Sequence, residues 1–145
     1  MAKVNWLIYC QHAGSPNPGA PLTANGVLFS MSPKYIPGQF SFSIAASVRD
    51  LDITKPNSIR LTFHSNEDNA ELIFDSNTLS IPPAPKEQSG VDLPKEYKGF
   101  ILSMDCSNVD IKHSGVYVTD VYINGNRIYQ ASIYVAAQTS NGVGA

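Results

Sequence analysis

Residues 113–135 have the sequence HSGVYVTDVYINGNRIYQASIYV. β-branched and aromatic residues, which favour strands, dominate on both sides of a central Asn124-Gly125-Asn126 corner. Asn and Gly tolerate the positive φ angles that a tight hairpin turn requires. The stretch therefore predicts two antiparallel strands joined at Asn124 and Gly125, and it contains no catalytic motif.

Alternating apolar and polar residues predict further strands upstream. Residues 40–48 carry apolar side chains at every second position, which indicates a sheet with one buried and one solvated face. The solvated face would carry Ser41, Ser43, Ala45, Ser47 and Arg49. Other strands are predicted at 4–11, 27–31, 59–63, 70–74, 79–81 and 100–106. Eight or nine short strands without a helical window predict an all-β fold, an antiparallel β-sandwich, with a jelly roll or barrel as the alternative.

The length of 145 residues predicts a single domain spanning 1–145. Long loops are expected near 12–22 and 82–98, where prolines accumulate. Proline has no N–H to donate to a β-ladder, so neither segment can form a central strand. Loops of this length often carry binding residues.

A short motif at the start of the hairpin has a known counterpart. Ser114-Gly115-Val116-Tyr117-Val118 resembles the Gly-x-Tyr segment that opens the penultimate strand of immunoglobulin-like domains. The resemblance implies that Gly115 is a turn residue and that the Tyr117 hydroxyl bonds back to the preceding corner. The chain departs from that family where Thr119 replaces the usual cysteine and where its single tryptophan, Trp6, lies in the first strand.

The chain as a whole also resembles small bacterial and phage immunoglobulin-like β-sandwich proteins of unassigned function. Three elements carry this resemblance: the apolar strand 6–9, the alternating strand 40–48 and the Gly-x-Tyr hairpin 115–135. It implies an immunoglobulin-like sandwich of about 8–9 strands and a phage or mobile-element origin. It implies no catalytic residue and no cofactor.

The charge and the hydropathy of the chain argue against a nucleic-acid partner and against a membrane span. The net charge is −2 and charged residues make up only 15% of the chain, so a nucleic-acid partner is not expected. No apolar run approaches the ~20 residues of a membrane span, and no secretory signal is recognised. These features predict a cytoplasmic protein, with association to a virion as the alternative. The low charge fits either a surface rich in Ser and Asn or apolar area kept for a partner.

Cysteine and histidine offer few candidates for chemistry. Cys10 and Cys106 are expected to be free and buried in a reducing compartment, with a bridge between them as the alternative. The three histidines lack close-spaced Cys/His pairs, so no metal and no cofactor is predicted. An enzyme site would be sought where Cys10 neighbours His12 or where His64 neighbours Glu67. No nucleophile elbow is present, and we expect no enzyme.

Exposed tyrosines are the candidate binding residues, because their rings add contact area while the hydroxyl stays solvated. They are Tyr35, Tyr97, Tyr122, Tyr129 and Tyr134. Tyr122 and Tyr129 flank the hairpin turn and could form a cross-strand pair.

The sequence thus predicts a non-enzymatic protein-interaction or structural module. It would bind a protein partner or self-associate through edge strands or the two long loops. A carbohydrate-binding β-sandwich is one alternative, which would place several tyrosines on one exposed face. A small enzyme with an unrecognised site is the other.

Overall fold

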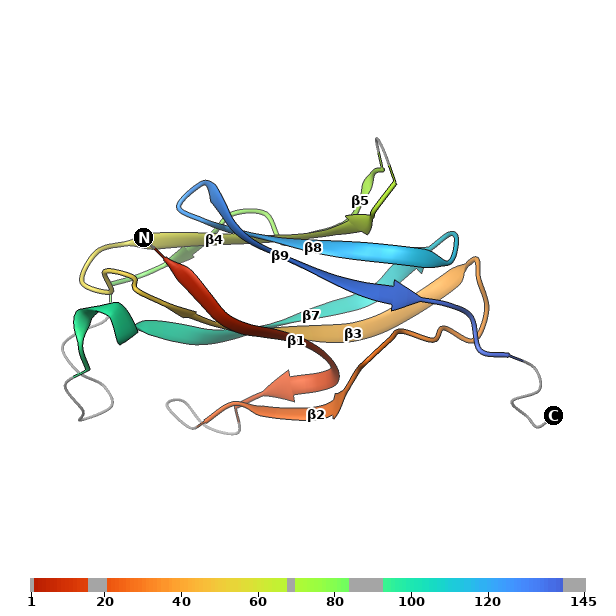
Figure 1. The fold of residues 1–145 in the computed structure, drawn as a ribbon, viewed down its shortest axis with the longest axis horizontal. Helices are drawn as coiled ribbons and strands as arrows, with labels where there is room; N and C mark the ends of the chain where they lie inside the picture. The colour runs from red at the N-terminus through yellow and green to blue at the C-terminus, as the bar shows by residue number, and fades with distance from the viewer. Residues whose placement is uncertain (1, 16–20, 68–69, 84–92, 140–145) are drawn as a thin grey trace.

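The computed structural model describes residues 2–15, 21–67, 70–83 and 93–139 (Figure 1). Within these residues the chain forms nine strands and one short 3₁₀ helix, η1 (Lys95–Tyr97). The strands are β1 (Lys3–Gly14), β2 (Thr23–Val27), β3 (Gly38–Arg49), β4 (Asn57–Ser65), β5 (Leu72–Asp75), β6 (Leu79–Ile81), β7 (Gly99–Ile111), β8 (Gly115–Ile123) and β9 (Asn126–Val135).

Two antiparallel sheets lie face to face, so the predicted all-β sandwich is confirmed. The first sheet has the order β2-β1-β3-β7, and the second has the order β5-β4-β8-β9, with β6 paired to β4 beside β5. Consecutive strands change sheet from β3 to β4, from β6 to β7 and from β7 to β8. Both sheets are open, which distinguishes the fold from a closed barrel.

Aromatic rings from both sheets fill the space between them. The ring centroids of Phe42 and Phe63 lie 5.1 Å apart, and those of Phe63 and Tyr117 lie 5.5 Å apart. Burying one such side chain contributes about 1.5–3 kcal/mol, so this cluster is a major source of stability. Tyr9 of β1 belongs to the same core cluster and lies at its margin, beside the groove between β1 and β9.

The outer face of β3 differs from the prediction. Ser43 and Ala45 were expected to be solvated, but their exposed fractions are 2% and 0%. Ala45 belongs to a second small cluster with Cys10 and Ala13, against which Leu22 packs. The small side chains on the outer face of β3 therefore leave room for side chains of β1 and of Leu22 to pack over them.

The first predicted loop and the second predicted strand have different boundaries in the structure. β1 continues to Gly14 because it pairs with β2, with His12 opposite Asn25. Instead of a strand at 27–31, the segment 28–33 crosses from one sheet to the other. Leu28 N donates to Tyr9 O (2.7 Å), and Met31 N donates to Tyr134 O (3.0 Å).

The second predicted loop lies partly outside the described residues, which omit 84–92. Its end forms η1, where the guanidinium of Arg49 lies 5.2 Å from the centroid of the Tyr97 ring. No helix in the described part of the chain is long and apolar enough to cross a membrane.

The β8–β9 hairpin turns at Asn124 (φ 50°) and Gly125 (φ 84°), and positive φ at both central residues is the signature of a type I′ turn. Beyond the turn, Tyr122 faces Arg127 while Val121 faces Tyr129. Ile128 is thus an extra residue in β9, a β-bulge. The bulge puts Tyr122 and Tyr129 on opposite faces of the sheet, so the predicted cross-strand pair does not form.

Candidate interaction surface

β9 is the outer strand of the second sheet, and it is paired with β8 along its length. The segment 28–33 covers only its C-terminal end: Met31 N binds Tyr134 O, and Ala136 N binds Met31 O, both at 3.0 Å. In an antiparallel ladder, backbone groups of alternate residues point the same way. The N–H and C=O groups of Ser132 and Gln130 therefore point away from β8. Among the described residues no backbone group of the neighbouring segments binds them.

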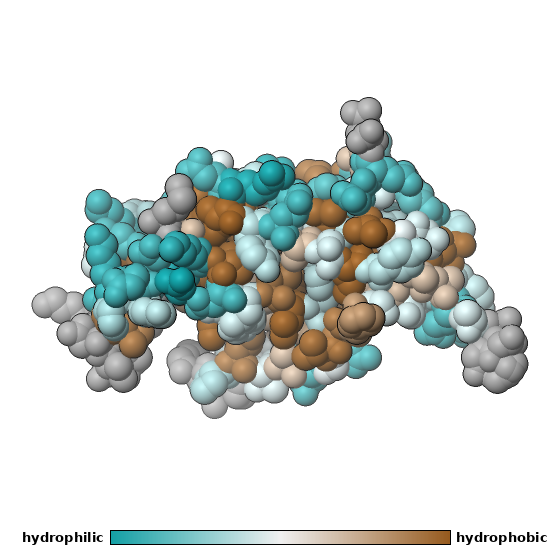
Figure 2. Space-filling view, viewed as in Figure 1, coloured by the Kyte–Doolittle hydropathy of each residue, from teal (hydrophilic) through white to brown (hydrophobic). Residues whose placement is uncertain are grey.

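A groove of mixed polar and apolar surface runs beside this free edge, between β9 and β1 of the other sheet. It has a volume of about 520 Å³. Figure 2 shows hydrophobic side chains gathered in the middle of this face, between more hydrophilic margins. The groove is lined by Leu7, Ile8, Tyr9, Val27, Leu28, Phe29 and residues 129–133. Phe29 is 99% exposed and Val27 is 63% exposed, so the groove has an uncovered aromatic side chain at its margin.

Three other strands at sheet edges carry features that normally prevent pairing with a second chain. β2 and β5 are only five and four residues long. β7 is long, but it carries Asp105 and Asp110 and is interrupted by a bulge at Asn108, whose φ is 53°. Charges, bulges and short strands all disfavour edge-to-edge association. β9 has one charged residue, Arg127, and an uncharged run from Ile128 to Val135. Of these four strands it is the least protected.

The outer face of the second sheet is polar and internally paired. The carboxylate of Asp120, only 5% exposed, accepts hydrogen bonds from Gln130 Nε2 (2.8 Å) and lies 3.5 Å from Arg127 Nη1. His64 Nε2 lies 3.0 Å from the same carboxylate, and its Nδ1 lies 2.8 Å from Ser65 O. Both ring nitrogens of His64 are engaged, so neither is free to act as a general base toward another side chain.

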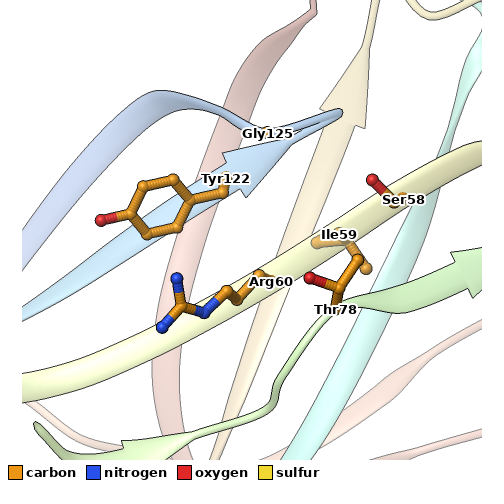
Figure 3. A pocket seen from close by; sticks show the side chains of 6 residues that line it. All are labelled: Ser58, Ile59, Arg60, Thr78, Tyr122 and Gly125. Atoms are coloured by element: carbon orange, nitrogen blue, oxygen red, sulfur yellow. The ribbon is translucent and has the colours of Figure 1, made fainter.

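A shallow pocket of about 220 Å³ opens on the same face (Figure 3). The side chains of Arg60, Thr78 and Tyr122 surround it, and the Arg60 guanidinium lies 5.5 Å from the centroid of the Tyr122 ring. Arg60 also binds Asp75 through two hydrogen bonds, Nε to Oδ1 (3.0 Å) and Nη2 to Oδ2 (2.7 Å). These bonds hold the pKa of Asp75 below its usual value, and they offset the charge of Arg60.

The predicted tyrosines are dispersed over the molecule. Tyr35 lies between β2 and β3 and is 69% exposed, whereas Tyr97 lies on η1. Tyr122 and Tyr134 share the outer face of the second sheet. Tyr134 pairs with Val116, which lies six residues from Tyr122 along β8, so the two tyrosines are about 20 Å apart. Tyr129 lies on the opposite face, beside the groove. The structure thus brings only Tyr129 of this set to the groove.

The predicted structural residues of the hairpin have defined contacts. Tyr117 Oη donates to His113 O, four residues upstream, at 2.6 Å, which is the contact of a tyrosine corner. Gly115 has a φ of 138°, a conformation that favours glycine. The side chain of Asn124 accepts from Ser58 N and donates to Asn57 Oδ1, both at 2.9 Å, so it fixes the turn against the start of β4.

The residues considered for catalysis lie in surroundings that do not suit a reactive pair. Cys10 is fully buried, and burial raises the pKa of its thiol, which is the opposite of what a nucleophilic thiolate needs. Glu67 lies 3.4 Å from His113 instead of contacting His64. Cys10 and Cys106 are both free, and they belong to different apolar clusters. Within the described ranges, no three His, Cys, Asp or Glu side chains group as a metal site.

Sequence reasoning missed the groove and its most exposed residue, Phe29. A partial signal was available in the eight-residue uncharged run Ile128–Val135, which follows a hairpin turn near the end of the chain. The contribution of Phe29 could not be foreseen, because it depends on the crossing of residues 28–33 between the sheets.

Comparison with known proteins gives no family. No protein-family model and no curated protein sequence matches the chain. Among solved structures it is similar to an alkylpurine DNA glycosylase from Pseudomonas fluorescens, with 11% identity and a TM-score of 0.49 over 94% of this chain and 30% of that chain. It is also similar to a β-glucosidase from Listeria innocua, with 7% identity and a TM-score of 0.47 over 94% of this chain and 16% of that chain.

A superoxide reductase (neelaredoxin) from Ignicoccus hospitalis is similar as well, with 12% identity and a TM-score of 0.37 over 91% of this chain and 83% of that chain. The chain spans less than a third of the length of the glycosylase and of the glucosidase. At these identities and TM-scores, the likenesses assign no activity to this chain.

Proposed function

We propose that this chain is a non-enzymatic protein-interaction module that adds an extended segment of a protein partner to its β9 edge. The observation that carries the proposal is the pair of outward-pointing backbone positions, Gln130 and Ser132, beside the groove between β9 and β1. Strand addition uses these two elements together, because backbone hydrogen bonds give affinity and adjoining pockets select side chains.

The groove is suited to every second side chain of an added strand. Side chains of a strand alternate between faces, so those on the inner face would lie against Tyr9, Tyr129 and Ile133. Those on the outer face would lie beside Gln130 and Ser132. Met31 already makes one parallel bridge with the end of β9, and an added strand would occupy the edge between that bridge and the turn.

A proline substitution tests the edge directly. Ser132→Pro removes an N–H that points to solvent while leaving the bonds to β8, and proline is tolerated at such edge positions. Ser132→Ala keeps the N–H and is the matched control. In a selection of displayed random peptides, wild type and Ser132→Ala should enrich uncharged, β-branched sequences and Ser132→Pro should not. Equal binding by all three proteins, or no peptide binding and no self-association by wild type, would refute the proposal.

A second candidate function is binding of a neutral carbohydrate at the Arg60–Tyr122 pocket (Figure 3). An aromatic ring beside a bidentate Arg–carboxylate pair can stack against a sugar ring and bond its hydroxyls, and Asp75 offsets the charge that would attract anions. A glycan array tests it. Specific signal that Tyr122→Ala abolishes supports this function, and an array without specific signal removes it.

Two features favour an immunoglobulin-like assignment of the sandwich, namely the corner contact of Tyr117 and the crossings from β3 to β4 and from β7 to β8. A phage or mobile-element origin, with a cytoplasmic or virion-associated location, rests on the sequence resemblance. The gene neighbourhood tests it: phage structural genes beside this gene would support an assembly role.

A further inference from the structure

We infer that the segment added to β9 is β9 of a second copy of this chain, paired antiparallel about a two-fold axis at Ala131. The inference rests on the proposed function, since both use the same edge. It goes further by naming the partner and the register, both of which follow from the backbone of β9.

The direction of the backbone groups limits the register. Two antiparallel strands exchange hydrogen bonds only where outward-pointing residues face each other. With the axis at Ala131, Gln130 faces Ser132 of the second copy, and Ser132 faces Gln130 of the second copy. Both residues have outward-pointing N–H and C=O groups. Each of the two facing pairs can therefore exchange two hydrogen bonds.

Neighbouring registers are worse for reasons that the structure shows. An axis at Gln130 sets Ser132 opposite Ile128, which is the extra residue of the β-bulge. An axis at Ser132 sets Gln130 opposite Tyr134, whose carbonyl oxygen already accepts from Met31 N. An axis at Ala131 sets the bulge at Ile128 opposite Tyr134 instead. The two positions that cannot pair then lie opposite each other. The ladder is confined to Tyr129–Ile133, because Met31 already occupies the edge at Tyr134 and Val135 and the strand of the second copy has to turn away there.

Charge does not oppose this arrangement. Arg127 is the only charged residue of β9, and in this register it lies beyond the ladder, near the end of the second copy's β9 that Met31 covers. Like charges that face each other across two strands are destabilising, and this register sets no such pair across the axis. Tyr129 faces Ile133, an aromatic and β-branched pair of the kind that stabilises adjacent strands. Both lie against the groove, so pairing also covers apolar surface there.

The register can be read by cross-linking. At a non-hydrogen-bonded antiparallel pair the Cα atoms are about 4.5 Å apart, within the range of a disulfide. The axis places Ala131 opposite Ala131 of the second copy, so Ala131→Cys should oxidise to a covalent dimer. Val116→Cys, a half-exposed position on β8, is the matched control and should stay monomeric. The two natural cysteines are buried and do not compete.

Sedimentation equilibrium of the full chain measures the dissociation constant of the dimer. Wild type and Ser132→Ala should dimerise, and Ser132→Pro should weaken dimerisation by about thirtyfold or more, because each dimer loses two hydrogen bonds. Circular dichroism reports whether the Ser132→Pro chain folds, and if it does not, the cross-linking of Ala131→Cys decides alone.

Two results would overturn the inference: a wild type that stays monomeric while Ala131→Cys oxidises no faster than Val116→Cys, or a dimer that forms without that cross-link. In the first case, peptide binding sensitive to Ser132→Pro would leave the proposed function standing. If the chain neither dimerises nor binds peptides, both the inference and the proposed function are refuted.

Discussion

The hydroxyl of Tyr9, on β1, lies 2.6 Å from Oγ1 of Thr119, on β8 of the opposite sheet. Tyr9 is 5% exposed and Thr119 is fully buried, so the hydrogen bond crosses the interior of the sandwich. The pair therefore fixes the distance between the two sheets next to the groove at β9.

Removing one partner of this pair should cost more than removing both. Tyr9→Phe leaves the Thr119 hydroxyl buried without a partner, and Thr119→Val does the same to Tyr9. Each change is expected to lower the free energy of unfolding by about 1–3 kcal/mol. The double variant should be more stable than the sum of the two losses predicts, as measured by urea unfolding in a double-mutant cycle. Strict additivity would show that the bond contributes nothing.

Stability should fall in alkaline solution, because the Tyr9 phenol and the Cys106 thiol ionise at a higher pH in the folded chain than in the unfolded chain. Burial raises the pKa of Tyr9 and that of the Cys106 thiol to about 12, above the usual values of 10.0 and 9.0. The unfolded chain therefore loses these protons first as the pH rises. Their contribution to stability is complete below about pH 9 and disappears progressively toward pH 12.

Urea midpoints measured from about pH 8 to about pH 11 check this expectation. The variant that combines Tyr9→Phe with Thr119→Val lacks the phenol and should show a shallower decline than wild type. An equal decline in both proteins would show that Tyr9 does not carry the effect.

The turn at Asn124 and Gly125 should be sensitive to the loss of positive φ. Gly125 has a φ of 84° with open space around it, so Gly125→Ala meets only backbone strain and should cost about 1 kcal/mol. Asn124→Ala should cost more, because it also removes the bonds to Ser58 N and Asn57 Oδ1. Thermal unfolding measures both changes. A smaller loss for Asn124→Ala than for Gly125→Ala would contradict this ranking.

Local sequence signals were enough for most of the strands and for this turn, since Asn-Gly and alternating residues determine a hairpin within a few positions. They were not enough for its register. The bulge at Ile128 depends on how β8 and β9 pair, and it reversed the expected relation of Tyr122 and Tyr129. The second predicted strand was wrong for a similar reason, because Met31 pairs with β9, more than 100 residues away along the chain.

The candidate surface was less accessible to sequence reasoning than the fold. Edge strands were named as binding elements, but no local pattern tells which strand lies at an edge. That information resides in the sheet order, in which β9 has one neighbour. The contacts of His64 with Asp120 likewise follow only from the pairing of β4 with β8.

The Arg60–Asp75 pair should make stability fall in acid. The hydrogen bonds from Arg60 lower the pKa of Asp75 from 3.8, so the folded chain keeps this carboxylate ionised where the unfolded chain has begun to protonate it. Its contribution is complete above the unfolded value and is lost as the pH falls through the folded value. Asp75→Asn should therefore flatten the acid limb of the stability profile, as measured by urea midpoints between about pH 5 and pH 2.

Arg60→Lys is the companion variant. Lysine keeps the charge but cannot make the two parallel bonds that join β4 to the end of β5, so it should resemble Asp75→Asn in acid and lose stability near neutrality. Both groups are partly exposed, and salt should reduce the difference between wild type and either variant. An acid limb unchanged by either substitution would show that other carboxylates, such as Asp52 beside Thr54, govern the acid response.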